Sequence, residues 1–307
     1  MARMTNTETV REKSSTNEIF ISPTKEVHPS DGSLFQFVLI TFVFSWLFWL
    51  PGSFFSLNSG EYLYSINGFI IIGSFGPFIA SFYLTYKQSG QYGVVTLWKS
   101  GWHCEKKIFL LISVILIPLI CGIALYITSF NERITIETYL TGYRSQYGYL
   151  AFEIVAIFFF GGPFQEEFGW RGFALNKLQS RWNALESSII LGGIWSGWHF
   201  PLFYIPGTMY YNQSFFSFTS SVLGYSIIFT WIYNSSNGSI LASMLFHTSI
   251  NTTQVLFLQK FSFWSTIYFI IILDIIMLLI LGIYGKEELK WSKNRAKIYK
   301  NLFKYRY

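Results

Sequence analysis

One stretch decides the interpretation of this chain: Gly161-Gly162-Pro163-Phe164-Gln165-Glu166-Glu167-Phe168-Gly169-Trp170-Arg171. It follows the largely apolar run 151–160, which is aromatic enough to lie in lipid. A charged side chain near the centre of a bilayer costs at least about 2.5–3.5 kcal/mol on insertion scales. We therefore expect Glu166, Glu167 and Arg171 to serve a function at a membrane-embedded helix end.

The composition is that of a polytopic membrane protein. Of 307 residues, 51% are hydrophobic and only 12% are charged, whereas soluble domains carry about 25% charged residues. Two cysteines are too few for a disulfide framework. Because a span needs about 20 apolar residues, the sequence predicts an all-α bundle of about eight transmembrane helices. The expected spans are 34–50, 65–86, 108–129, 149–162, 187–206, 215–233, 238–258 and 264–284.

The basic residues predict the orientation of this bundle. Among the 22 Lys and Arg residues, the loops on one side hold only Arg133, Arg144 and Lys260. The positive-inside rule then places both termini in the cytoplasm. We expect a disordered cytoplasmic tail at 1–32, a transmembrane bundle at 33–285 and a basic cytoplasmic tail at 286–307.

The basic C-terminal tail is expected to bind anionic lipid headgroups. Nucleic acid is not an expected partner, because binding it would need a soluble basic domain and the sequence has none. The partners that we expect are membrane lipid and a protein or peptide substrate. The sequence leaves the oligomeric state open.

Helix geometry separates the two adjacent carboxylates. Glu167 and Arg171 are four residues apart, so on a helix they share a face and can pair. Glu166 points about 100° away, which leaves it free to face a cavity. Pro163 is well placed to begin the helix. The simpler alternative is an ion pair that anchors a loop at the membrane edge.

Two further segments carry polar pairs one helical turn apart. The segment 195–199 reads Trp195-Ser196-Gly197-Trp198-His199, and the segment 247–251 reads His247-Thr248-Ser249-Ile250-Asn251. Taken singly, His199 could be a satisfied structural histidine, and His247 with Asn251 could join helices by hydrogen bonds. Taken together with Glu166, they predict one polar cavity. The span count puts these groups in the cytoplasmic half, so we expect a cavity open to the cytoplasm.

A carboxylate, two histidines and an amide suit hydrolysis of an amide bond by water. The carboxylate can accept a proton from water while one histidine orients it. The other histidine and the amide can donate hydrogen bonds to the oxyanion. No cysteine lies near the motifs, and Ser196 and Ser249 are in no nucleophile-elbow context, so an acyl-enzyme is disfavoured. Two histidines and a glutamate are also suitable zinc ligands. Their spacing does not decide between a zinc site and a site in which the side chains alone activate water.

At these residues the chain resembles the CAAX proteases and bacteriocin-processing enzymes, the CPBP family, which includes the type II CAAX prenyl endopeptidases. The pattern of that family is E-E-x-x-x-R, then an aromatic residue with x-x-x-H, then H-x-x-x-N/D, each on a separate membrane segment. Here it covers about 149–254, and Trp195 stands where Phe is common. The tails and the first three spans match only as generic membrane helices.

The resemblance implies an intramembrane endopeptidase that cuts a membrane-associated or lipid-linked protein or peptide. Glu166 would activate water with His199, and His247 and Asn251 would form the oxyanion site. The supporting residues would be Glu167, Arg171 and Trp195. The preferred mechanism needs no cofactor. Zinc is the alternative, and its ligands would be Glu166, His199 and His247.

The resemblance also bears on the biological setting. Prenylated substrates belong to eukaryotic members, while prokaryotic members are associated with peptide maturation or bacteriocin self-immunity. Residue usage favours a prokaryotic cell membrane. Two other classes of function stay open: a transporter or proton path that would add Glu153 and Asp274, and a non-catalytic immunity or scaffold protein.

Overall fold

Helices make up the regular structure of the part of the chain that the computed structural model describes, namely residues 32–56, 62–132, 147–211, 213–257 and 261–291. The all-α prediction is therefore confirmed for these residues. They belong to one unit that begins at Asp31. The predicted tails fall mostly outside them, since residues 1–31 and 292–307 are not described.

Five helical stretches of the described chain are long and apolar enough to cross a membrane: Ser33–Pro51, Gly68–Ser100, Ile108–Glu132, Phe215–Ser235 and Phe263–Tyr284. They overlap five of the eight predicted spans, although the second stretch extends to Ser100, beyond the predicted 65–86. Many large apolar side chains on them point away from the protein interior, including Phe35, Val43 and Leu278. Such surfaces suit lipid rather than water, which marks the chain as an integral membrane protein.

The first helices are α1 (Ser33–Ser56), α2 (Tyr62–Gly73), α3 (Gly76–Ser100) and α4 (Ile108–Glu132). The sequence predicts one span over 65–86, but the chain breaks between α2 and α3. Pro77 lies at the start of α3 rather than inside a helix, because proline fits the first turn and lacks the N–H that a helix interior needs. Pro118, by contrast, lies inside α4.

The three spans that carry the polar motifs are shorter or broken. The fourth consists of α6 (Tyr147–Phe160), α7 (Pro163–Gly169), the π-helix η2 (Trp170–Leu175) and α8 (Asn176–Gln179). The fifth, predicted as continuous over 187–206, is α9 (Ala184–Trp198) followed by the 3₁₀-helix η3 (Phe200–Tyr204). After α10 (Phe215–Ser235) comes α11 (Ile240–Leu256), and α12 (Phe263–Tyr284) ends the bundle.

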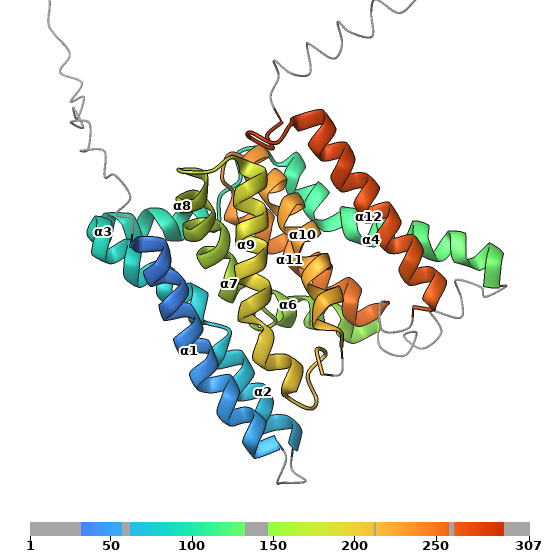
Figure 1. Cartoon of the computed structure of the whole chain (residues 1–307), viewed down its shortest axis with the longest axis horizontal. Helices are drawn as coiled ribbons and strands as arrows, with labels where there is room; N and C mark the ends of the chain where they lie inside the picture. Colours follow the sequence, from blue (N-terminus) through green and yellow to red (C-terminus); the bar gives the residue numbers. More distant parts are fainter. Residues whose placement is uncertain (1–31, 57–61, 133–146, 212, 258–260, 292–307) are drawn as a thin grey trace, which may run out of the picture. The chain divides into compact units, whose positions relative to one another are not determined.

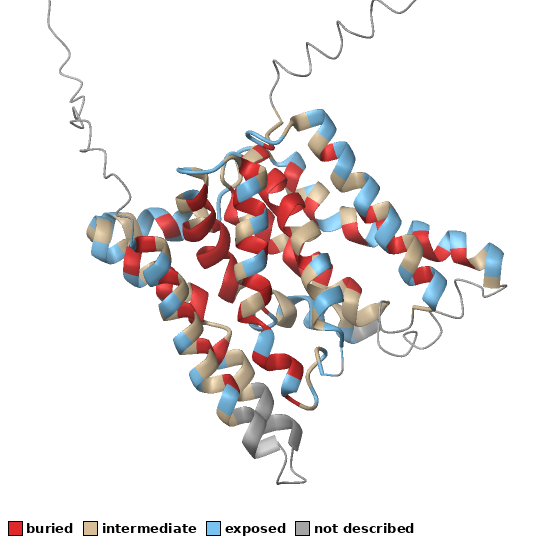
Figure 2. Cartoon of the chain, in the orientation of Figure 1, coloured by how far each residue is buried: buried red, intermediate tan, exposed pale blue. Residues whose placement is uncertain are grey.

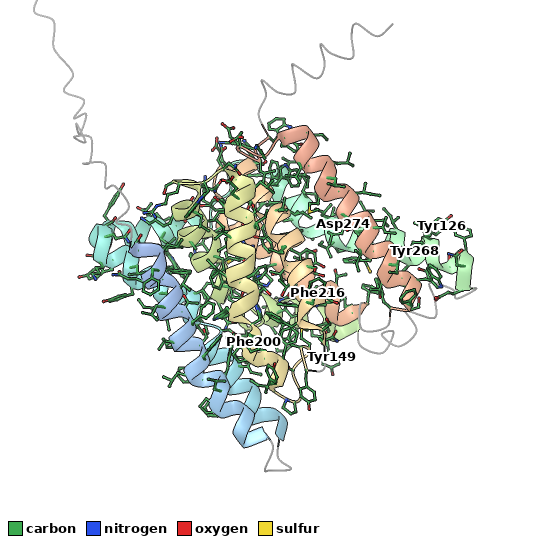
Figure 3. All side chains as sticks on the ribbon, viewed as in Figure 1. Tyr126, Tyr149, Phe200, Phe216, Tyr268 and Asp274 are labelled. Carbon is green, nitrogen blue, oxygen red and sulfur yellow. The ribbon has the colours of Figure 1, made fainter. Side chains whose placement is uncertain are left out.

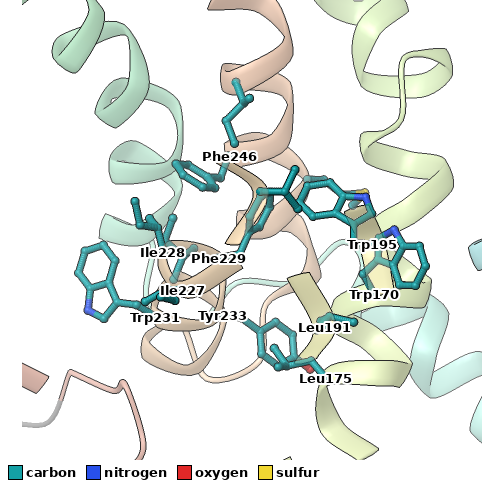
Figure 4. Packing of buried hydrophobic residues seen from close by; sticks show 14 of the residues in the cluster. Trp170, Leu175, Leu191, Trp195, Ile227, Ile228, Phe229, Trp231, Tyr233 and Phe246 are labelled. Carbon is teal, nitrogen blue, oxygen red and sulfur yellow. The ribbon is translucent and has the colours of Figure 1, made fainter. Parts of the chain in front are cut away.

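The elements that carry the motifs form the interior. Contacts join α7 to α3 and α11, α9 to α10, and α11 to α4. Colouring by burial shows α7, η2 and α11 as the most continuously buried segments, while α12 presents one exposed side (Figure 2). Around them pack large apolar side chains such as Trp170, Phe229 and Phe246 (Figure 4). The polar motifs are therefore held inside the bundle rather than on its lipid face.

Gly169 sets how closely α7 approaches α3. A Cβ at this position would lie 2.5 Å from the Cβ of Pro77 and 2.6 Å from its carbonyl oxygen. No real side chain fits that space, so the two helices are in contact through backbone. This close approach fixes the segment that carries Glu166 and Glu167 against the first half of the bundle.

We predict that Gly169→Ala destabilises the folded protein by about 1–3 kcal/mol, because overpacking forces the backbone to move. The measurement is the thermal unfolding midpoint of the purified protein in detergent. Gly193→Ala is the matched control, since a Cβ at Gly193 meets nothing within 4 Å and its midpoint should stay the same or rise. Equal midpoints for both variants would contradict the packing argument.

Candidate active site

The chain turns sharply just before the paired carboxylates. Gly162 has φ 113°, a conformation that side chains with a Cβ rarely adopt. Its N–H donates to Gln165 Oε1 at 3.1 Å, and Gln165 Nε2 donates to the carbonyl of Ile71 in α2 at 2.7 Å. Pro163 then begins α7, as the sequence predicts. The turn thereby aims the first residues of α7 into the bundle.

Glu167 is the centre of a buried chain of charged groups. Arg171 Nη1 lies 2.9 Å from Glu167 Oε1 and 3.0 Å from Oε2. His247 Nδ1 lies 2.8 Å from the same Oε1. The solvent exposure of Glu167 and Arg171 is 0% and that of His247 is 4%. The predicted pair of Glu167 with Arg171 is therefore present, and it reaches His247 on α11 as well.

Aromatic rings cover the rest of the Arg171 guanidinium. Its carbon lies 3.6 Å from the centroid of the Phe229 ring and 4.8 Å from the Trp195 ring. Arg171 Nε and Nη2 have no hydrogen-bond partner in the described structure. Cation–π attraction partly replaces those bonds, and it is strongest in desolvated positions.

Glu166 occupies a different environment, as the helix geometry predicts. Its Oε2 accepts hydrogen bonds from the indole N–H groups of Trp195 at 2.7 Å and Trp170 at 3.1 Å. A Cβ at Gly162 would lie 2.6 Å from Glu166 Oε1 and 3.4 Å from His247 Nε2. Because both atoms approach the same point, the second oxygen of Glu166 and the free nitrogen of His247 face one small volume.

His199 is held by its own helix end. Its Nδ1 lies 2.8 Å from the carbonyl oxygen of Trp195, and a carbonyl only accepts, so Nδ1 carries a proton. In the neutral ring Nε2 is then an acceptor. The ring is 5% exposed and lies against the ring of Tyr210, with 5.4 Å between centroids. Burial, and secondarily the charge of Glu166, raises the pKa of the Tyr210 phenol.

Asn251 lies one turn beyond His247, and its Nδ2 donates to the carbonyl of Gly161 at 2.8 Å. One amide proton is thus committed to the turn before α7, and the second is left for another acceptor. Hydrogen bonds therefore join the first motif on α7 and η2 to Trp195 on α9 and to His247 on α11.

Trp170 is a contact that the sequence interpretation missed. The sequence does contain a signal for this contact, because Trp170 is four residues after Glu166 and therefore on the same helix face. The π-helix η2 that starts at Trp170 was not predicted. Such wide turns occur often at functional sites.

A cavity of about 500 Å³ opens beside these residues. Trp195, His199, His247 and Asn251 form one wall, and the remaining wall comes mainly from the first half of α10 and the first half of α12. The cavity joins the two histidines and the asparagine to a space that could receive a peptide.

The cavity and the basic residues lie at opposite ends of α10 and α12. Basic residues lie at the opposite ends of these helices: Lys106 donates to the carbonyl of Ser235 at the end of α10, and Lys286 follows α12. The cavity wall instead uses the starts of α10 and α12. The lining of the cavity therefore lies at the ends of α10 and α12 that are remote from Lys106 and Lys286.

The zinc alternative finds no ligand set in the described residues, where no three His, Cys, Asp or Glu side chains lie together in a way that could hold a metal ion. In addition, both hydrogen bonds to Glu166 Oε2 come from indole N–H groups, which occupy the lone pairs of that oxygen. Glu166 Oε1 accepts neither of these bonds, so the hydrogen bonds alone leave zinc as the alternative to the metal-free mechanism.

Comparison with known proteins covers the segments that carry these residues. Residues 149–253 match the family described as type II CAAX prenyl endopeptidase Rce1-like. The chain is also 41% identical over 97 residues to CAAX prenyl protease 2 of Methanococcus maripaludis. That match covers 30% of this chain and 36% of the relative, so it spans little more than a third of the relative's length. Residues 149–253 of this chain are therefore similar to the Rce1-like type II CAAX prenyl endopeptidases.

Proposed function

We propose that this protein is an intramembrane endopeptidase that hydrolyses a peptide bond in a membrane-associated or lipid-linked protein or peptide. The observation that carries the proposal is the shared volume beside Gly162, which both Glu166 Oε1 and His247 Nε2 face. A carboxylate and an imidazole aimed at one point, next to a cavity of about 500 Å³, suit attack of water on a bound carbonyl.

In the proposed reaction, Glu166 takes a proton from water as the water oxygen bonds to the carbonyl carbon. His199 Nε2 accepts the second hydrogen bond of that water and so orients it. The carbonyl oxygen becomes an oxyanion that accepts hydrogen bonds from His247 and Asn251. The tetrahedral intermediate then breaks its C–N bond, and Glu166 passes its proton to the leaving amine.

Charge balance supports the role of His247. Glu166 and Glu167 bring two negative charges, and Arg171 brings one positive charge. If Nδ1 donates to Glu167 and Nε2 donates to the oxyanion, His247 carries a proton on both ring nitrogens at that step. Glu167 and Arg171 therefore act as positioning residues, because they reach the reaction through His247.

The walls of the cavity suggest a substrate that is largely apolar. Aromatic side chains from α10 and from the region of α12 line it, including Phe216, Phe261 and Phe269. Such a lining favours apolar residues or a lipid group beside the bond that is cut. No cofactor has a step in this mechanism.

A second candidate function is a proton or ion path, since Asp274 lines the same cavity as His199 and His247. Glu153, the other residue that such a path would recruit, is exposed on α6 and is not part of the cavity wall. Ion flux into proteoliposomes without cleavage of any peptide would favour this candidate over the endopeptidase.

We expect Glu166→Gln to lower the rate of peptide cleavage at least about 100-fold, because an amide cannot take the proton of water. Cleavage would be measured with membrane peptide substrates identified by comparing the peptides of a deletion strain with those of the complemented strain. Glu153→Gln is the control, since this exposed carboxylate lies outside the cavity and its loss should leave the rate unchanged. A Glu166→Gln protein that folds and cuts at the parental rate would end the proposal.

We also expect cleavage to survive removal of divalent metal. The purified protein would be dialysed against EDTA and 1,10-phenanthroline and then assayed in metal-free buffer. Because no step is assigned to a metal, the rate should stay within about twofold of the untreated sample. Loss of activity that returns on adding Zn²⁺ would overturn the metal-free mechanism while leaving the endopeptidase proposal in place.

We further propose that the basic helix ends face the cytoplasm, which turns the mouth of the cavity toward the opposite membrane half. On intact cells, a membrane-impermeant maleimide should then label a thiol introduced by Gln213→Cys, which lies on the cavity wall. The natural Cys104, which precedes Lys106 at the basic end, should react only in lysed cells. Gln213→Cys would be combined with Cys104→Ser, which removes the natural thiol. Labelling of Cys104 would be measured in the protein that keeps Gln213. The reverse labelling pattern would show that the cavity opens to the cytoplasm.

A further inference from the structure

Asp274 is a carboxylate near the midpoint of α12, and it lines the same cavity as the two histidines. Figure 3 labels it along that helix. The side chain is exposed rather than packed among its neighbours. A charge near the middle of a membrane-spanning helix is costly where it faces lipid, so the cavity that Asp274 lines is the more favourable environment for its carboxylate.

The negative charge of Asp274 has no partner among the described residues, with which it forms neither a hydrogen bond nor an ion pair. Among the described residues, the cavity wall contains no Lys or Arg, and its other titratable groups are His199, Tyr210, Tyr225 and His247. Nδ1 of each histidine already has a hydrogen-bond partner: the carbonyl oxygen of Trp195 for His199, and Glu167 for His247. Asp274 is therefore an uncompensated carboxylate in a largely aromatic cavity.

The α10 wall of the cavity adds hydrogen-bond acceptors. Ser220 donates its hydroxyl proton to the carbonyl of Phe216, and Ser221 donates to the carbonyl of Ser217, both at 3.1 Å. Because the protons are used within the helix, the lone pairs of these hydroxyl oxygens are the groups left for a ligand. A wall with acceptors and one carboxylate selects a ligand that donates.

We propose that Asp274 anchors a subsite for a cationic group of the peptide substrate, either a Lys side chain or a free amino terminus. The inference rests on the proposed endopeptidase function for the identity of the ligand as a peptide. An ammonium group supplies three donors and a positive charge, which match one carboxylate and neighbouring hydroxyl oxygens. The cationic group would enter the cavity on the α12 side while the bond to be cut reaches His199 and His247.

Equilibrium binding tests the subsite independently of cleavage. The probes are fluorescein-labelled apolar nonapeptides in nanodiscs, each blocked at the amino terminus and carrying one Lys or one norleucine at the same position. A third probe has norleucine and a free amino terminus. Fluorescence anisotropy would give Kd for each probe with the parental protein, with Asp274→Asn and with the control Glu153→Gln. A second variant, Asp274→Glu, keeps the charge.

We expect at least one of the two cationic probes to bind about tenfold more tightly than its norleucine partner. This preference should be found in the parental protein, in Glu153→Gln and in Asp274→Glu. Asp274→Asn should bind both probes with the affinity that the parental protein has for norleucine. The probe that binds more tightly, with Lys or with a free amino terminus, identifies the source of the cationic group. Equal affinities in the parental protein, or discrimination that persists in Asp274→Asn, would overturn the subsite. Cleavage in the same samples is scored separately, so binding that depends on Asp274 without cleavage would support the subsite and contradict the hydrolase.

Discussion

Arg171 carries its charge in the interior of the bundle, where an unpaired guanidinium would be strongly destabilising. Removing one partner of a buried ion pair costs about 3–5 kcal/mol, so Glu167 is required wherever Arg171 is kept. The same carboxylate oxygen also contacts His247 Nδ1 at 2.8 Å. The need to neutralise one arginine thus joins η2, α7 and α11, and it decides which nitrogen of His247 is left to face the site.

This constraint gives the two neighbouring glutamates different chemistry. Glu167 spends both oxygens on Arg171 and one of them on His247 as well. Glu166 is turned away from that pair, and two indole N–H groups hold one of its oxygens. The other oxygen faces the volume beside Gly162. Two adjacent residues on one helix therefore supply one carboxylate for structure and one that is available to a ligand or to water.

The sequence was sufficient for the parts of this arrangement that follow from local periodicity. The pairing of Glu167 with Arg171 and the start of α7 at Pro163 both rest on helix geometry, and both are present. The contacts between His247 and Glu167, and between Trp195 and Glu166, join residues 80 and 29 positions apart. No period in the sequence encodes such separations, because they depend on how the helices pack.

The errors in the predicted spans have the same origin as the site itself. A hydropathy window sees 187–206 as one apolar segment, but α9 ends at Trp198 and His199 begins a 3₁₀ turn. Likewise α6 ends at Phe160, and two glycines separate it from α7. Backbone that leaves the helix at membrane depth is tolerated only where protein buries it or a water-filled cavity solvates it. Both breaks therefore lie beside the polar groups of the site. At the glycine turn, Glu166 and His247 face one volume. At the end of α9, the ring of His199 lines the cavity. These two breaks, before α7 and after α9, lie where the proposed chemistry takes place.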